Sequence, residues 1–226
     1  MTESGVKKIM ADRTAAPEGN GAATGALTAC WSCQGPVAAA ALFCHVCGAV
    51  QPPREADAYT RLGFEPRFDI DMAELDKRYL GFQRNLHPDR FARKGPRERA
   101  IAENQAMSLN QAYETLKDAV RRAQALLARA GIASPVGESR TIEDRELLME
   151  AMEVREALAE SNDLDAVARL AERAQREDAA CIKALTAAFA ARDWAEAVRQ
   201  TTRLRYWRKF AEELRGRRAV LAGTSV

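Results

Sequence analysis

Apolar residues recur every three or four positions over much of the chain, a spacing typical of amphipathic helices. The first such segment covers residues 71–86, and Asp71 followed by Glu74 predicts its N-terminal cap. A second segment covers residues 96–117, after a turn at Gly95. Their apolar positions are Met72, Leu75, Tyr79, Phe82 and Leu86, then Ala102, Ala106, Leu109, Tyr113 and Leu116. We therefore expect an antiparallel helical hairpin with these residues along its seam.

Three more helical patterns follow a linker at residues 131–139, over residues 142–160, 164–191 and 194–215. The third has a near-heptad seam, formed by Trp194, Ala197, Thr201, Leu204, Ala211 and Leu214. This pattern predicts an antiparallel three-helix bundle over residues 142–216. Because β-branched runs are scarce while Ala, Leu, Glu and Arg are abundant, we expect an all-α protein.

The first bundle helix carries more apolar residues than its core face requires. That face is complete with Leu147, Ala151, Val154 and Leu158. At roughly 100° per residue, the far side holds an apolar patch beside acids, formed by Leu148, Met149, Met152, Glu153 and Glu156. On the third helix, Tyr206 also lies off the core seam. A methionine-rich apolar patch beside acids is a candidate partner surface, although periodicity alone equally allows it to pack against another helix of this chain.

The tripeptide His87-Pro88-Asp89 stands between the two helices of the hairpin. Proline disfavours helix at the preceding residue, so we expect these side chains to lie in a loop, where binding residues often occur. From Lys77 to Arg97 there are seven Lys and Arg but one acid, Asp89. Such clustered charge steers an acidic partner to the surface, whereas an isolated basic stripe is usually a solvated helix face. His87 could instead be a general base or a metal ligand, but the sequence around it supplies neither a nucleophile nor a second ligand.

Four of the five cysteines form two C-x2-C pairs, Cys30 with Cys33 and Cys44 with Cys47, separated by ten residues. Four thiolates at this spacing indicate a structural zinc knuckle over residues 30–53, with no position left for a reactive water. Spacing alone also allows iron, or a redox dithiol. We expect His45 to be exposed or outside the ligand set, and Cys181 to be packed within a helical seam.

Composition narrows the functional classes. The chain has 226 residues and a net charge of +2, too small to indicate nucleic-acid binding, and the knuckle has no Lys or Arg between its cysteines. There is no run of about 18 apolar residues, so no membrane partner is expected. No nucleophile–base pair, phosphate loop or open metal site suggests an enzyme. Residues 1–29 lack secretory and transit features, and are expected to be a disordered tail of a cytoplasmic protein.

Residues 56–130 resemble the J-domain, the module that activates heat-shock chaperone ATPases. The resemblance lies in the helix, the His-Pro-Asp loop, the following helix and its tail from Asn110 to Asp118. It implies that Asp89 makes the hydrogen-bonding and ion-pairing contact, that Pro88 holds the shape of the loop and that His87 orients it. The implied chaperone-binding set is His87, Pro88, Asp89, Lys77, Arg78 and Arg84.

A narrower resemblance covers about residues 59–215 and is to the HscB family. It lies in residues 64–70, the Leu86-His-Pro-Asp-Arg-Phe91 loop, residues 147–156 and residues 202–206. It implies a co-chaperone that serves an HscA-type chaperone and binds an IscU-type iron–sulfur scaffold. The implied scaffold-binding residues are Leu148, Met149, Met152, Glu153, Glu156 and Tyr206.

Two features depart from the commonest pattern of that family. Tyr206 stands where an aromatic residue without a hydroxyl is usual, and the cysteine knuckle is similar to that of eukaryotic members. A eukaryotic source would imply the mitochondrial matrix in place of the cytoplasm. A general J-protein that delivers other clients is the alternative function.

Overall fold

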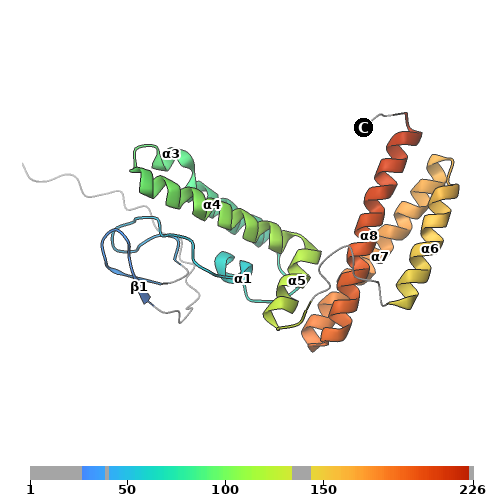
Figure 1. The fold of residues 1–226 in the computed structure, drawn as a ribbon, viewed down its shortest axis with the longest axis horizontal. Helices are drawn as coiled ribbons and strands as arrows, with labels where there is room; N and C mark the ends of the chain where they lie inside the picture. Colours follow the sequence, from blue (N-terminus) through green and yellow to red (C-terminus); the bar gives the residue numbers. More distant parts are fainter. Residues whose placement is uncertain (1–26, 39–40, 134–143, 224–226) are drawn as a thin grey trace, which may run out of the picture.

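The computed structural model describes residues 27–38, 41–133 and 144–223. The expectations for residues 1–26, and for most of the linker at 131–139, lie outside these ranges. Apart from one small sheet, the described elements are helices, which confirms the all-α class. Figure 1 shows two helical units side by side, with the cysteine segment beside the N-terminal unit. The surfaces considered below lie far apart in this arrangement.

The sheet belongs to the cysteine segment. Strands β1 (Leu27–Ala29) and β2 (Pro36–Ala38) pair antiparallel, with Thr28 opposite Val37. The prediction that the tail extends to residue 29 is therefore wrong for its last three residues. Three residues are too few for an alternating pattern, so this strand depends on its partner rather than on its own sequence.

The N-terminal unit contains α1 (Ala58–Leu62), α2 (Met72–Leu86), α3 (Pro88–Phe91), α4 (Pro96–Lys117) and α5 (Ala119–Arg129). The Asp71 side chain accepts hydrogen bonds from Ala73 N and Glu74 N, which confirms the predicted cap. Tyr79 of α2 stacks on Tyr113 of α4 with 3.9 Å between ring centroids. These contacts close the α2–α4 hairpin, and its core includes the fully buried Leu75, Leu109 and Leu116.

The prediction of an irregular loop at His87-Pro88-Asp89 is only partly right. His87 is not helical, but Pro88 begins the short helix α3. Proline is well suited to the first helical position, because its missing N–H would have no intrahelical partner there.

The C-terminal unit is a bundle of α6 (Arg145–Glu160), α7 (Leu164–Ala191) and α8 (Trp194–Leu221). Each helix begins with an aspartate cap, at Asp144, Asp163 and Asp193. Helix α8 continues six residues beyond the expected end at 215. Its buried face includes Trp207 and Phe210, which the predicted seam omitted.

An aromatic and ionic junction joins the two units. Phe68, which precedes α2, stacks on Phe189 of α7 with centroids 5.4 Å apart. The buried Arg122 guanidinium of α5 lies 4.8 Å from the Phe68 ring on the N-terminal side. Arg208 of α8 donates to Asp118 and to Asp178, each at 2.8 Å. The junction therefore holds α5 against the bundle and sets the direction of α4 relative to α6.

Candidate partner-binding surfaces and metal centre

The His-Pro-Asp corner faces outward. Asp89 is 90% exposed, and its carboxylate lies 3.5 Å from His87 Nδ1. The Asp89 backbone N–H donates to that same nitrogen at 3.4 Å, so His87 caps α3. Buried Phe91 anchors the other end of this short helix. Helix α3 lies at the end of the N-terminal unit far from α6 (Figure 1), where a partner has open access to the Asp89 carboxylate.

The basic residues of α2 differ in availability. Lys77 is 81% exposed and lies 3.6 Å from Glu74, while Arg84 is exposed beside the corner. A groove of about 310 Å³ separates α2 from α4 there, lined partly by Leu80, Arg84 and Pro88. A partner that reaches the corner would meet both this groove and the Arg84 side chain.

Arg78, by contrast, is used within the protein. It donates to Glu74 at 2.7 Å and to the Gly63 carbonyl, and its guanidinium lies 4.3 Å from the Phe64 ring centroid. The Arg78 hydrogen bond lowers the pKa of Glu74. Arg78 therefore secures the connection between α1 and α2, which leaves Lys77 and Arg84 as the more accessible cations of this set.

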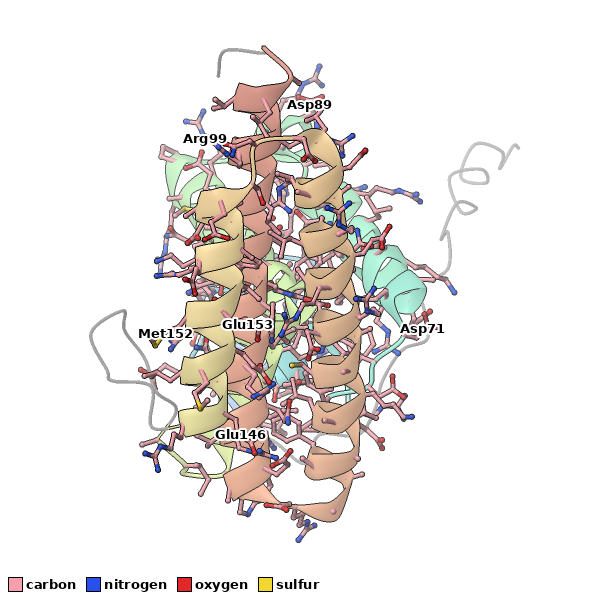
Figure 2. All side chains as sticks on the ribbon, turned by 90° about the vertical axis from the view of Figure 1, so that its right-hand side faces the viewer. Asp71, Asp89, Arg99, Glu146, Met152 and Glu153 are labelled. Carbon is pink, nitrogen blue, oxygen red and sulfur yellow. The ribbon has the colours of Figure 1, made fainter. Side chains whose placement is uncertain are left out.

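On α6, the apolar patch is open. Met149 and Met152 are 69% and 68% exposed, and Leu148 is also exposed, whereas Leu147 and Val154 of the same helix are fully buried. Figure 2 shows Met152 directed away from the other two bundle helices. The alternative interpretation, in which this patch packs against another helix of the chain, is therefore wrong.

The polar residues of the predicted scaffold-binding set lie in different environments. Glu156 is exposed. Glu153 accepts hydrogen bonds from Arg173 of α7 at 3.0 and 3.4 Å. Tyr206 is half-buried, donates its hydroxyl to Ala151 O at 3.3 Å and stacks on Phe210. The hydroxyl of Tyr206 thus contacts the backbone of α6, while the three apolar side chains, Glu153 and Glu156 are open to solvent.

The sequence analysis did not predict the arginines that attach α6 to its neighbouring helix. Arg203 of α8 donates to Glu150 at 2.7 Å and lies 3.6 Å from Asp144. Arg155 of α6 lies 3.5 Å from Glu213. No signal within α6 predicts these pairs, because each depends on the rotation of one helix relative to another.

The four knuckle cysteines converge, which the C-x2-C spacing predicted. All four sulfur atoms lie within 4.8 Å of one another, with Cys30 to Cys47 at 3.8 Å and Cys33 to Cys44 at 3.7 Å. A cluster of four sulfur donors this compact suits a single metal ion. Exposed His45 is not among the ligands, and buried Cys181 lies in α7, where burial raises the pKa of its thiol to about 11.

Hydrogen bonds around Cys30 favour its thiolate. Burial disfavours the charged form, but backbone N–H groups and the Gln51 amide lower its pKa to about 6. The Gln51 Nε2–Sγ distance is 3.3 Å, and Ser32 N lies 3.4 Å from the same sulfur. The surrounding donors therefore suit an anionic sulfur ligand, as metal binding requires.

The knuckle is docked on α4 rather than tethered beside it. Buried Gln105 of α4 donates to the Gln51 carbonyl at 2.8 Å. Arg97 lies 4.7 Å from the Trp31 ring centroid, and Leu42 and Val50 belong to the same hydrophobic cluster as the hairpin. The sequence analysis missed Gln51 and Gln105, since neither lies in a recognisable motif.

A family model described as the HSCB C-terminal oligomerisation domain matches residues 143–215. The HscB homolog of Arabidopsis thaliana, an iron–sulfur cluster co-chaperone, is 32% identical over 82% of this chain and 72% of its own length. Human HscB is 30% identical over 82% of this chain and 80% of its own. The human HscB crystal structure superposes with a TM-score of 0.77, at 30% identity, over 83% of this chain and 96% of that one. A Vibrio cholerae HscB structure has a TM-score of 0.65 at 29% identity, and the match covers 74% of this chain and 99% of that one.

The hairpin with its outward His-Pro-Asp corner, joined to a three-helix bundle, defines a J-domain co-chaperone. The chain belongs to the HscB family of iron–sulfur cluster co-chaperones. Within the part of the chain that the structure describes, no helix has the length and apolar character needed to cross a membrane.

Substitution of Gln105 tests whether the knuckle is part of the J-domain. Gln105→Leu keeps the side chain large but leaves the buried Gln51 carbonyl without its donor. We expect it to lower the free energy of unfolding by about 1–3 kcal/mol in urea denaturation. Hydrogen exchange should rise in residues 41–51 as well as in α4. The matched variant Glu103→Leu, at an exposed position of α4, should change stability by less than about 0.5 kcal/mol. Equal effects of the two variants would show that the hydrogen bond from Gln105 to the Gln51 carbonyl contributes nothing to stability.

Proposed function

We propose that this co-chaperone binds an IscU-type iron–sulfur scaffold on its bundle and presents it to an HscA-type chaperone, whose ATPase it stimulates through the His-Pro-Asp corner. One observation carries this proposal. An outward Asp89 and an outward methionine patch lie at opposite ends of a molecule whose two units are joined at the Phe68–Phe189 junction. One protein can therefore contact two partners at once without steric competition between them.

In this proposal the protein has no catalytic step of its own. Asp89 would pair with a cationic group of the chaperone, Pro88 would hold the backbone of the corner, and His87 would orient Asp89 through its contact with the Asp89 N–H. Lys77 and Arg84 would attract an acidic surface of the chaperone. Arg78 would support the same helix through its hydrogen bonds to Glu74 and to the Gly63 carbonyl. ATP hydrolysis would take place in the partner, and its free energy would drive the scaffold to release its cluster to acceptor proteins.

The scaffold would bind at Leu148, Met149, Met152, Glu153, Glu156 and Tyr206. Exposed methionines supply an adaptable apolar contact, and carboxylates beside them favour a basic partner. Tyr206 would act partly by supporting the backbone of α6 through its hydrogen bond to Ala151. Neither nucleic acid nor membrane is part of this function. The expected compartment is the cytoplasm, or the mitochondrial matrix in a eukaryote.

The metal in the knuckle would be one structural Zn²⁺ ion held by Cys30, Cys33, Cys44 and Cys47. The ion would supply stability, because a segment this small has little apolar core of its own. Its docking on α4 extends that stabilisation to the J-domain.

Asp89→Ala tests the chaperone contact. Because Asp89 is exposed, we expect the free energy of unfolding to change by less than about 0.5 kcal/mol and scaffold binding to persist. Stimulation of the ATPase of the matching chaperone should be lost in a steady-state assay. Glu103→Ala, which removes an exposed acid from α4, should stimulate normally. Full stimulation by Asp89→Ala would refute the assignment of the corner.

Met149→Ser and Met152→Ser test the scaffold surface. Each should weaken scaffold binding by more than about fivefold in titration calorimetry, because apolar anchors dominate such contacts. Thermal unfolding and basal ATPase stimulation should be unchanged, since both side chains are largely exposed. A protein that stimulates the ATPase but does not bind the scaffold would instead be a general J-protein.

Metal content tests the knuckle. Native mass spectrometry should show one zinc per chain, and chelation should remove it and lower the thermal unfolding temperature. Cys181→Ala should keep the zinc, whereas Cys44→Ser should lose it. A reduced, folded and metal-free wild-type protein would contradict the proposed site, and bound iron would contradict the choice of metal.

A further inference from the structure

The four sulfur ligands of the knuckle differ in their access to water. Cys30 and Cys44 are buried, whereas Cys33 and Cys47 are exposed. Water can donate hydrogen bonds to an exposed sulfur, but a buried thiolate needs donors from the protein. Four thiolates also carry more negative charge than one divalent ion neutralises, and residues 27–51 include no Lys or Arg. Hydrogen-bond donors to the buried sulfurs are therefore needed to hold a metal ion here.

The Cys30 sulfur receives two such hydrogen bonds, from donors of different origin. Ser32 N lies 3.4 Å from it and belongs to the same C-x2-C turn, so this donor comes with the local backbone. Gln51 Nε2 donates to it at 3.3 Å, although the two residues are 21 positions apart. The Gln51 amide also donates to Ala49 O at 2.8 Å. The contribution of Gln51 to the metal ligand therefore depends on tertiary structure.

The backbone of Gln51 is fixed from two sides. Its N–H donates to Leu42 O within the knuckle at 2.8 Å. Its carbonyl accepts from Gln105 Nε2 of α4, also at 2.8 Å, and both glutamines are only 2% exposed. Because the carbonyl and the side chain share one Cα atom, a shift of the carbonyl away from Gln105 would also move the amide away from the Cys30 sulfur.

A second contact brings the two donor segments together. Trp31 lies within the C-x2-C turn of Cys30, and its Nε1 donates to the carbonyl of buried Val50 at 2.6 Å. The Arg97 guanidinium of α4 lies 4.7 Å from the centroid of the Trp31 ring. Helix α4 thus contacts both the turn that carries Cys30 and the segment that carries Gln51.

We infer that Gln51 is a positioning residue of the metal site and that α4 holds it in place through Gln105, so that the J-domain raises the affinity of the knuckle for its metal. By linkage, a bound metal ion strengthens the docking of the knuckle on α4 to the same extent. This inference rests on the proposed metal site, and refines it by adding a residue outside the four ligands.

Zinc affinity of the full-length protein tests this inference, by equilibrium competition with a chromophoric chelator. Gln51→Leu should weaken Zn²⁺ binding about tenfold, because residues that hydrogen-bond to metal ligands contribute at least this much. Gln105→Leu acts indirectly and should weaken it about threefold. Two matched controls should stay within about twofold of wild type. Thr28→Val removes a side-chain hydrogen bond of the knuckle that does not reach a sulfur, and Gln111→Leu makes the same substitution at an exposed position of α4.

The double variant tests whether Gln105 acts through Gln51. Once Gln51→Leu has removed the amide, the placement of residue 51 no longer matters for the sulfur. Adding Gln105→Leu should then weaken Zn²⁺ binding little further, as expected for residues that act through a shared contact. If the two losses of affinity simply multiply, Gln105 affects the knuckle by another route and the inference is wrong.

Cobalt provides a readout that a general loss of stability would not change. A hydrogen bond lowers the energy of the sulfur lone pairs, so its loss should move the sulfur-to-Co²⁺ charge-transfer band to longer wavelength in Gln51→Leu. Gln105→Leu should move the band in the same direction, and Thr28→Val should leave it in place. If Gln105→Leu loses the helical circular dichroism of wild type, Gln105→Asn, whose amide is one methylene too short, makes the same test. An unchanged band or an unchanged Zn²⁺ affinity in Gln51→Leu would each overturn the inference.

Failure of the proposed metal site gives a different result. If wild type binds neither Zn²⁺ nor Co²⁺, or binds them equally well after Cys44→Ser, the site itself has been misassigned and the role of Gln51 is overturned with it. If Cys44→Ser loses the metal but both glutamine variants bind it as wild type does, the metal site stands and only the inferred coupling to α4 falls.

Discussion

The stack of Phe68 on Phe189 is the contact on which the rest of this structure depends. It joins the segment before α2 to α7, with Arg122 on one side and the Arg208 pairs to Asp118 and Asp178 beside it. Aromatic stacking and buried arginine contacts resist sliding more than a polar linker does. The junction therefore holds the His-Pro-Asp corner and the α6 patch at opposite ends of the molecule, as the proposed binding of two partners requires.

The second constraint is the continuity between the cysteine knuckle and the J-domain. Gln51 contacts the Cys30 sulfur through its side chain and accepts from Gln105 through its carbonyl. Gln51 thus connects the four-cysteine cluster directly to α4. The knuckle lies against the helix that also supports α3, so its stability bears on the orientation of the corner.

In the bundle, two arginines form ion pairs that attach α6 to its neighbouring helices. Arg203 and Arg173 bind acids of α6 and so attach a helix that has only two fully buried side chains. Glu153 stays 67% exposed in its pair with Arg173, so this pairing does not bury the carboxylate.

Much of this protein follows from sequence because it depends on local rules. The Asp71 cap, the helical periods, the C-x2-C spacing and the position of the α6 methionines off the core face each involve residues within a few turns of one another. The structure decided what depends on contacts between distant segments: the pairing of β1, the burial of Trp207 and Phe210, the internal role of Arg78, the docking through Gln105 and the capture of Glu153 by Arg173. A helix pattern shows which side is apolar, but only packing determines its rotation relative to its neighbours, and therefore which charges meet.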